Sequence, residues 1–327
     1  MPELPEVETI RRGLHSRIIG KTISGAHNYD SPKSFPNATA DITQFLQGAT
    51  VTDVSRRAKV LLIELSTGYT LVTHLKMTGQ IIFIAPITSR HSTDSNPVIL
   101  SVSEESSSTL EDPSVKPQDD TRNVRWGGGH PSDSFMRELP DNTTREHIDF
   151  TDGSRLYFND LRKFGWMKLY PTSEVPNIDF MKKVGPEPLL DDFTGEVLWE
   201  RLQRRKNTSI KAAILDQTVL AGVGNIYADE SLWGARIHPA TLVKNVPKAS
   251  ILQLAEEIKA VMNLSIEKGG STDKNYVNAE GKKGSYLSFA RVFRREGEPC
   301  PRCGTTIVKT RVAGRGTHLC PTCQTKQ

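Results

Sequence analysis

The sequence predicts an α+β protein, and three observations carry this prediction. Segments rich in strand-forming residues fill the first half of the chain, and segments with apolar residues at helical spacing fill the second half. All the cysteines lie at or after Cys300. Strands followed by helices are typical of α+β folds, and 327 residues are enough for two domains with separate cores. The chain has no long apolar run, so we expect no membrane span.

Residues 1 to about 18 are expected to form a helix that opens at a proline. Glu3 and Glu6 then lie in its first turn, where carboxylates are stabilised by the helix macrodipole. The apolar residues recur at helical spacing on one face, as Ile10, Leu14 and Ile18. By itself this pattern is that of an ordinary helix N-terminus.

Strand-like runs follow the helix and predict an antiparallel sheet. A hairpin turn is expected at Ser66–Gly68 and another at Thr151–Ser154. The expected strands are residues 50–54, 60–65, 70–74, 80–84, 147–150 and 155–159.

A long segment interrupts these strands and is expected to be a disordered acidic insertion. It runs from about residue 87 to 144, is rich in Ser, Asp, Glu and Pro, and contains Gly127–Gly129. Residues 86–146 hold 6 basic and 11 acidic side chains. We expect the sheet to close across this insertion.

The overall net charge of +4 averages over two opposite tendencies along the chain. In contrast to the acidic insertion, residues 282–327 hold 10 basic and 2 acidic side chains. This asymmetry favours a nucleic-acid partner over a small neutral substrate, although a solvated basic face would also explain it.

From about residue 171 the chain is expected to be helical. Gly222 and Gly224 separate two of the expected helices, which indicates a helix, a glycine turn and a second helix. The expected helices are residues 194–204, 210–217, 226–233 and 248–268.

The four cysteines form two Cys-x-x-Cys pairs near the C-terminus. Sixteen residues separate the pairs, which suits four thiolates around one tetrahedral, structural Zn²⁺. Two disulfides are the alternative, but no signal segment follows Met1, so we expect a reducing compartment. The basic, glycine-rich stretch between the pairs is expected to be a two-stranded ribbon with its turn at Gly314–Gly316. The expected zinc ligands are Cys300, Cys303, Cys320 and Cys323.

Three stretches together resemble one family, the bacterial-type formamidopyrimidine-DNA glycosylases. They are Met1–Ile10 (MPELPEVETI), Leu215–Glu230 (LDQTVLAGVGNIYADE) and the terminal cysteine ribbon, and they occur in the family's order. The resemblance covers nearly the whole chain outside the acidic insertion.

The resemblance implies a fold, a domain division and an activity. The fold would be an N-terminal antiparallel β-sandwich flanked by helices over residues 1–170, a helix-two-turn-helix DNA-binding domain over 171–290, and a zinc finger over 291–327. The activity would be base-excision repair: removal of oxidised purines such as 8-oxoguanine and formamidopyrimidines from duplex DNA, with cleavage of the abasic site. The implied cofactor is one structural zinc ion.

The resemblance also implies the catalytic residues. Removal of Met1 would expose Pro2 as the nucleophile, and an α-amine with a pKa near about 8 is partly unprotonated at neutral pH. Glu3 would act as acid and base, and Lys59 would stabilise developing charge beside the sugar. Arg315, at the ribbon tip, would complete this set from the other side of the strand.

A second set of residues is implied in DNA binding. Base flipping leaves a hole in the duplex, which the family fills with an apolar residue and an arginine. Asn225, near a helix start after the glycines, would hold phosphate, and residues 269–286 would cap the everted base. The residues implied in DNA binding are Glu6, Met77, Arg162, Phe164, Lys211 and Asn225.

Two other functions stay open. One is an endonuclease VIII-like glycosylase for oxidised pyrimidines. Leu4 and the Arg162-x-Phe164 loop favour the purine branch over this alternative. The other is a non-catalytic zinc protein that binds DNA, although Pro2, Glu3 and Lys59 form a complete catalytic set. We expect a monomer in the bacterial cytoplasm, at the nucleoid.

Overall fold

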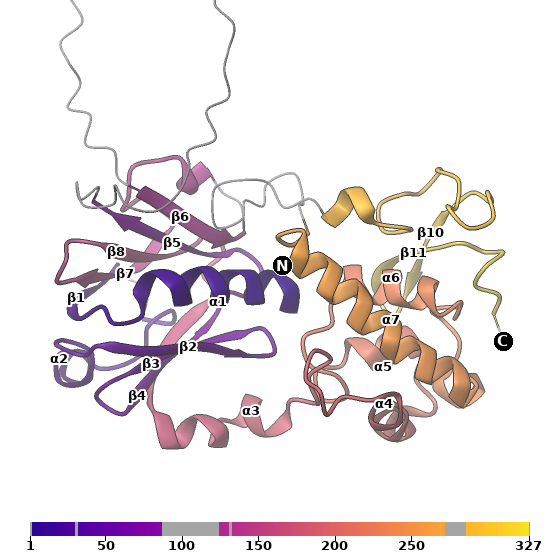
Figure 1. The fold of residues 1–327 in the computed structure, drawn as a ribbon, viewed down its shortest axis with the longest axis horizontal. Helices are drawn as coiled ribbons and strands as arrows, with labels where there is room; N and C mark the ends of the chain where they lie inside the picture. The colour runs from indigo at the N-terminus through magenta and orange to yellow at the C-terminus, as the bar shows by residue number, and fades with distance from the viewer. Residues whose placement is uncertain (1, 30–31, 87–123, 131–132, 272–285, 327) are drawn as a thin grey trace, which may run out of the picture.

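The computed structural model describes residues 2–29, 32–86, 124–130, 133–271 and 286–326. Its first domain contains two antiparallel sheets in separate layers (Figure 1), which confirms the expected β-sandwich. The five-stranded sheet has the order β1 (Ile23–Asn28), β7 (Thr144–Phe150), β8 (Arg155–Asp160), β5 (Gly79–Ala85) and β6 (Val124–Gly129). The four-stranded sheet has the order β2 (Val51–Arg57), β3 (Val60–Leu65), β4 (Tyr69–His74) and β9 (Trp166–Pro171).

The expected N-terminal helix is α1 (Leu4–Ile18), which packs beside both sheets. Its apolar face is buried in the sandwich core with side chains from both layers, as the helical spacing predicts. Gly13 makes the closest approach: a Cβ there would lie 2.0 Å from Cζ2 of Trp126 on β6. The helix and the edge strand therefore meet at a position that needs glycine.

The expected disorder of residues 87–144 is wrong for the last part of that segment. Residues 124–129 form β6, which pairs with β5 from Gln80↔Gly129 to Ala85↔Val124. A Cβ on Gly127 would lie 2.8 Å from the Phe135 ring, so glycine allows close packing at this edge. A glycine run without apolar alternation resembles a loop in sequence, which is why the strand was missed. Residues 87–123 lie outside the described residues.

The strands predicted on both sides of the insertion do join, because β5 and β8 pair from Gly79↔Asp160 to Ile84↔Arg155. Both expected hairpin turns are present, between β3 and β4 and between β7 and β8. Besides β6, the sequence patterns did not predict β1, β9 or the short helices α2 (Thr39–Phe45) and α3 (Asp179–Lys183).

The second domain is helical, as expected, and its core is separate from that of the sandwich. Its helices are α3 (Asp179–Lys183), α4 (Gly195–Leu202), α5 (Ile210–Leu215), α6 (Asn225–Gly234) and α7 (Lys248–Glu267). Short 3-10 turns lie at Asp133–Phe135, Thr172–Asn177, Gln203–Arg205, Val243–Asn245 and Tyr286–Phe289.

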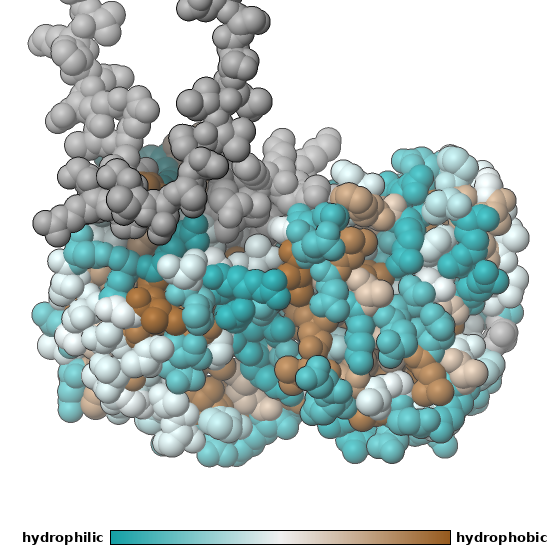
Figure 2. Space-filling view, in the orientation of Figure 1, coloured by the Kyte–Doolittle hydropathy of each residue, from teal (hydrophilic) through white to brown (hydrophobic). Residues whose placement is uncertain are grey.

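The chain ends in a two-stranded ribbon, β10 (Val308–Val312) and β11 (Arg315–Leu319), that contacts α6. Its turn falls at Ala313 and Gly314, which both have positive φ, slightly before the expected position. Hydrophilic side chains cover most of the face seen in Figure 2, and the apolar areas there are small. None of the helices in the described part combines the length and hydropathy that crossing a bilayer requires.

Candidate active site at the domain junction

A cavity of about 470 Å³ lies where the start of α1 meets the helical domain. In Figure 1 the N-terminus lies between the two domains, beside the end of α7. The walls come from segments far apart in the sequence. Seven of the residues expected to act on DNA line the cavity: Pro2, Glu3, Glu6, Lys59, Met77, Asn225 and Arg315.

The turn between α5 and α6 holds the start of α1 in place. Leu4 is fully buried in the core of the helical domain, and its N–H donates to Gly222 O at 3.2 Å. Gly222 has a φ of +79°, and a Cβ there would lie 2.3 Å from Leu4 Cδ1. Glycine is required at this position both by its conformation and by the close contact. This contact presents Pro2 and Glu3 to the cavity.

Glu3 is a buried carboxyl whose surroundings favour its protonated form. Burial raises its pKa from 4.5 to about 7, although the nearby Lys59 opposes the shift. Its Oε1 accepts a long contact of 3.5 Å from the Ile226 N–H, and its Oε2 has no hydrogen-bond partner among the described residues. A carboxyl with a pKa near neutrality can both donate and accept a proton there.

Gly224 provides the space that Glu3 occupies. A Cβ at this position would lie 2.0 Å from Glu3 Cδ and 2.2 Å from Oε1, closer than any real contact. The two glycines of the expected turn therefore have different partners, because Gly222 meets Leu4 and Gly224 meets the Glu3 carboxyl.

Glu6 holds the parts of the site together. Its Oε2 accepts from the Glu3 N–H at 2.8 Å, while its Oε1 accepts from Tyr227 Oη at 2.5 Å. The same Oε1 accepts from the backbone N–H and the hydroxyl of Ser271, each at 2.8 Å. The structure thus gives Glu6 a positioning role, and its expected DNA contact stays a prediction. Residues 272–285 of the expected capping loop lie outside the described residues.

Lys59 lies in the turn between β2 and β3, and its Nζ donates to Val223 O at 3.1 Å. Burial lowers the pKa of this ammonium, whereas the neighbouring Glu3 and Glu6 raise it. Two buried carboxylates fix this turn. The Glu187 carboxylate accepts a hydrogen bond from the N–H of Ala58, a residue with positive φ. Glu187 Oε2 also pairs with Arg56 Nη1 at 2.5 Å, and Glu8 Oε2 pairs with Arg56 Nε at 2.8 Å.

Neither Glu8 nor Glu187 was predicted to belong to the site. Glu8 is an ordinary helix residue in sequence, and Glu187 lies in an irregular segment far along the chain, so no local pattern indicates them.

Met77 and the Arg162–Phe164 loop lie at neighbouring turns of the sandwich. Asp160 joins these turns: its carboxylate accepts from the Thr78 hydroxyl, from the Arg162 N–H at 3.2 Å and from the Gly165 N–H at 2.6 Å. Met77 is 41% exposed and Phe164 is 54% exposed. Both side chains therefore lie outside the core, where they are accessible for insertion into a base stack.

Arg162 and Phe164 do not line the cavity, but they contact each other. The Arg162 guanidinium lies over the Phe164 ring at 4.9 Å from its centroid. Their DNA contacts, like that of Met77, stay predictions.

Lys211 is fully buried and binds protein groups. Its Nζ donates to Asp229 Oδ1 at 2.6 Å, to Gly316 O at 3.0 Å and to the Thr317 hydroxyl at 2.8 Å. An ammonium group has three protons, so these contacts use its donor capacity. The phosphate contact expected of Lys211 stays a prediction, and the observed contacts hold β11 against helices α5 and α6.

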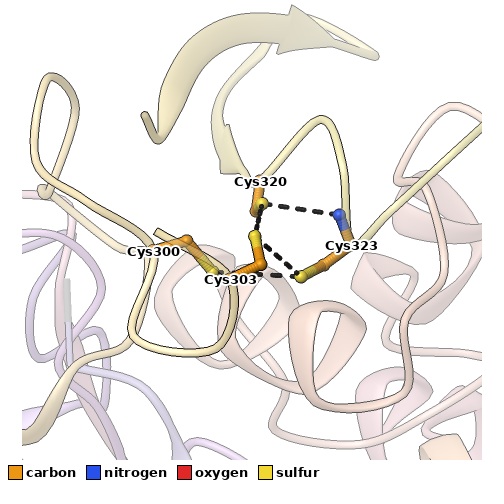
Figure 3. A group of neighbouring side chains, drawn as sticks. All are labelled: Cys300, Cys303, Cys320 and Cys323. Carbon is orange, nitrogen blue, oxygen red and sulfur yellow. Dashed lines mark hydrogen bonds between the residues drawn. The ribbon is translucent and has the colours of Figure 1, made fainter. Parts of the chain in front are cut away.

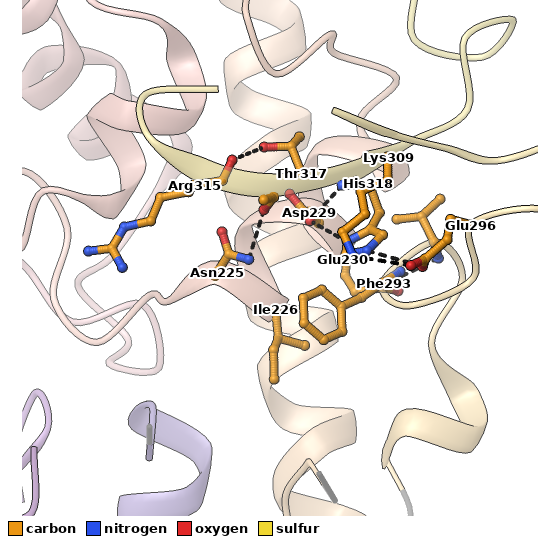
Figure 4. A network of polar contacts seen from close by, with 12 residues as sticks. Asn225, Ile226, Asp229, Glu230, Phe293, Glu296, Lys309, Arg315, Thr317 and His318 are labelled. Atoms are coloured by element: carbon orange, nitrogen blue, oxygen red, sulfur yellow. Dashed lines mark hydrogen bonds and ion pairs between the residues drawn. The ribbon is translucent and has the colours of Figure 1, made fainter. Parts of the chain in front are cut away.

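Asn225 and Arg315 lie beside this buried pair. Asn225 Nδ2 donates to Gly316 O at 3.0 Å, while its Oδ1 has no partner among the described residues. Figure 4 shows the Arg315 side chain extending away from the ribbon, on the side of Asn225. The long cationic side chain therefore reaches the cavity from the second domain.

The four cysteines converge below the ribbon from two loops (Figure 3). All four cysteines are free thiols. The Sγ atom of Cys303 lies 3.5 Å from that of Cys320 and 3.4 Å from that of Cys323. The Sγ atoms of Cys300 and Cys323 are 3.9 Å apart. A tetrahedral site with Zn–S bonds of about 2.3 Å has sulfur–sulfur edges of about 3.8 Å. The donor set therefore fits one zinc ion and does not match the disulfide alternative.

Comparisons with known proteins match all three parts of the chain. Residues 1–167 match the formamidopyrimidine-DNA glycosylase N-terminal domain, residues 184–276 match the H2TH domain of the same family, and residues 297–326 match a zinc finger found in FPG and IleRS. Similar proteins include the formamidopyrimidine-DNA glycosylases of Herpetosiphon aurantiacus (37% identity, covering 99% of this chain and 100% of the relative) and Chloroflexus aurantiacus (36%, covering 99% and 98%).

Solved structures agree with these matches. Lactococcus lactis Fpg in complex with DNA containing an abasic site has a TM-score of 0.76 at 31% identity, and the match covers 99% of this chain and 100% of that one. MutM in complex with DNA containing carbocyclic 8-oxo-G has a TM-score of 0.75 at 32% identity, with the same coverage.

Proposed function

The chain belongs to the formamidopyrimidine-DNA glycosylase family, and from this premise we propose how its residues remove oxidised purines from duplex DNA and cut the abasic site. The observation that carries the proposal is the single cavity in which Pro2, Glu3, Lys59 and Arg315 meet. The enzyme is a base-excision glycosylase and lyase with one structural zinc ion. With duplex DNA as its substrate, the enzyme would act at the nucleoid in the bacterial cytoplasm.

The reaction begins at the amine that Pro2 offers once Met1 is removed. Its nitrogen lone pair forms a bond to sugar C1′, the bond from C1′ to the base breaks, and the base leaves with the electron pair and takes up the proton that the Pro2 nitrogen loses. Glu3, protonated near neutrality, delivers a proton to O4′ as the sugar ring opens, so the new C–N bond becomes an iminium. Loss of a proton from C2′ then expels the 3′-phosphate, and water hydrolyses the iminium to free Pro2.

The other residues of the predicted set are proposed to bind DNA and to stabilise developing charge. Lys59 and Arg315 bring positive charge to the phosphates and to the reacting sugar from opposite domains. Asn225 lies at the start of α6, where a helix N-terminus favours an anion. Met77, Phe164 and Arg162 are proposed to fill the space left by the flipped base and to contact its partner base.

Covalent trapping tests this function directly. Borohydride should reduce the iminium and leave the protein attached to duplex DNA that contains 8-oxoguanine opposite cytosine. Pro2→Gly should weaken trapping, because a primary amine replaces the secondary one, and blocking the terminal amine should abolish it. Intact binding without a trapped product on any lesion would overturn the proposal.

The endonuclease VIII-like alternative is tested on matched duplexes. If oxidised purines are the preferred substrates, kcat/KM on 8-oxoguanine or formamidopyrimidine duplexes should exceed kcat/KM on duplexes carrying an oxidised pyrimidine. The opposite order would assign the chain to pyrimidine repair while leaving the Pro2 chemistry intact.

A further inference from the structure

A second cluster of potential metal ligands lies on the sandwich, outside the cavity. It consists of His27 on β1 and His147 and Asp149 on β7. His27 and His147 are direct partners across the two antiparallel strands, and Asp149 follows two residues later, on the same face as His147. Figure 1 shows β1 and β7 in the part of the first domain away from the helical domain.

The three donor atoms lie within 4.8 Å of one another, close enough to share one metal ion. His27 Nε2 and His147 Nε2 each lie 3.2 Å from the same oxygen, Asp149 Oδ2. The two imidazole rings stack with their centroids 4.5 Å apart. Zinc bonds to nitrogen and oxygen are about 2.0–2.1 Å long, so a tetrahedral site has donor–donor edges of about 3.3 Å.

The contacts behind two of the ligands resemble those that orient metal ligands in proteins. The other ring nitrogen of His147, Nδ1, lies 2.8 Å from the Tyr29 hydroxyl, and the second carboxylate oxygen of Asp149 accepts from Arg155 Nε at 2.8 Å. Such outer contacts fix the tautomer and the orientation of a ligand.

We propose that His27, His147 and Asp149 bind a divalent transition-metal ion, with Zn²⁺ as the first candidate, at a site distinct from the four cysteines. Two imidazoles and one carboxylate form a donor set that suits Zn²⁺ and its neighbours. The His27 side chain is 60% exposed, so an ion can reach the site from solvent, and solvent can complete its coordination.

The cluster has an alternative role as two hydrogen bonds from histidines to a shared carboxylate. That role needs no metal, and it predicts that the ring and carboxylate contacts are unaffected by zinc. A binding experiment therefore separates the two roles without any measurement of DNA cleavage.

The experiment counts zinc in the full-length protein whose cysteine site is already filled. After equilibration with micromolar free Zn²⁺, atomic emission should give two zinc equivalents per chain for wild type, and calorimetry should show one binding event for the second. His27→Ala, a surface change, should reduce the affinity of that event at least tenfold, and Asp149→Asn should do the same. Borohydride trapping should be unchanged in His27→Ala.

His15→Ala is the matched control, because His15 is an exposed histidine 3.8 Å from one carboxylate, that of Asp53, and the metal-ligand cluster does not include it. It should bind the second zinc as wild type does. The proposal is overturned if wild type takes up a single equivalent, or if His27→Ala binds the second ion as tightly as wild type.

Discussion

At the scale of single residues, the proposed acid is a carboxyl that the fold places in an unfavourable environment. Glu3 is buried, with one oxygen lacking a partner among the described residues, so its charged form loses hydration without full replacement. The neighbouring Lys59 offsets part of this cost. The site therefore keeps an acid near its working pH at the expense of folding stability, as is common at functional sites.

Glu3→Gln should change how stability depends on pH. The folded-state pKa of Glu3 is raised from 4.5 to about 7, so its contribution favours folding fully below pH 4.5 and is lost as the pH rises through 7. A shift of this size corresponds to about 3 kcal/mol. The difference in unfolding free energy between Glu3→Gln and wild type should grow by about that amount from acid to mildly alkaline pH.

Urea unfolding of both proteins at acid and at mildly alkaline pH checks this prediction. The zinc site is the same in both proteins, so its contribution cancels in the difference between their unfolding free energies. A difference that does not vary with pH would mean that the Glu3 carboxyl titrates normally. The same variant should lose nearly all glycosylase turnover, since glutamine cannot give up a proton.

Gly224→Ala should damage catalysis more than folding. The added methyl group would meet the Glu3 carboxyl, which must move, and overpacking of this kind costs about 1–3 kcal/mol. We expect a drop in kcat of at least about tenfold, since displacement of a catalytic group by about 1 Å is enough for a large loss. Gly25→Ala, where a Cβ meets nothing within 4 Å, is the control and should leave kcat unchanged.

At the scale of elements, the zinc ribbon is positioned by a buried ion pair. The ammonium of Lys211 on α5 joins the carboxylate of Asp229 on α6 to Gly316 and Thr317 on β11. Asp229 also accepts from the His318 N–H at 2.9 Å. The small buried cluster beside the ribbon has five residues, one of them Trp233 on α6, so this pair and the zinc ion must hold most of the ribbon's geometry.

Lys211→Met should destabilise the second domain by about 3–5 kcal/mol, because it leaves Asp229 buried without its partner charge. The double variant Lys211→Met/Asp229→Asn removes the charge and keeps an acceptor for the His318 N–H, so it should recover part of the loss. Chemical denaturation measures both.

Lys309→Met is the control for this series. Lys309 makes an exposed ion pair with Glu296 at 3.1 Å on the same ribbon, and its loss should cost less than about 1 kcal/mol. Equal effects of Lys211→Met and Lys309→Met would show that the buried pair does not hold the ribbon.

At the scale of the whole molecule, the two domains are joined at the active site itself. Leu4 from the first domain is buried in the core of the helical domain. Glu187, which comes after the sandwich in the sequence, forms an ion pair with Arg56 on the four-stranded sheet of the sandwich. The residues that line the cavity from both domains keep their relative positions through these contacts. Closure of the sandwich core by β6 supports the same arrangement, since Trp126 packs on α1.

The position of β6 allows a sharp deletion experiment. Ala85 and Val124 are direct partners, so a short glycine-serine linker in place of residues 88–122 should leave the sheet intact and lower kcat by less than about twofold. Extending the deletion to residue 143 removes β6 and should cause loss of cooperative thermal unfolding. Equal behaviour of the two deletions would show that β6 adds nothing to the fold.

The sequence determined the fold class, most strands and helices and the four cysteines of the zinc site, because these depend on local periodicity and cysteine spacing, and its motifs indicated the family; the catalytic set stays a prediction from that resemblance. The tertiary structure decided what those patterns cannot encode. Glu8, Glu187 and Asp160 join segments through contacts made only after folding, Lys211 proved to be a buried partner of Asp229, and a glycine run proved to be a strand. Each of these outcomes depends on burial and on neighbours distant in the chain, and no local window of residues contains that information.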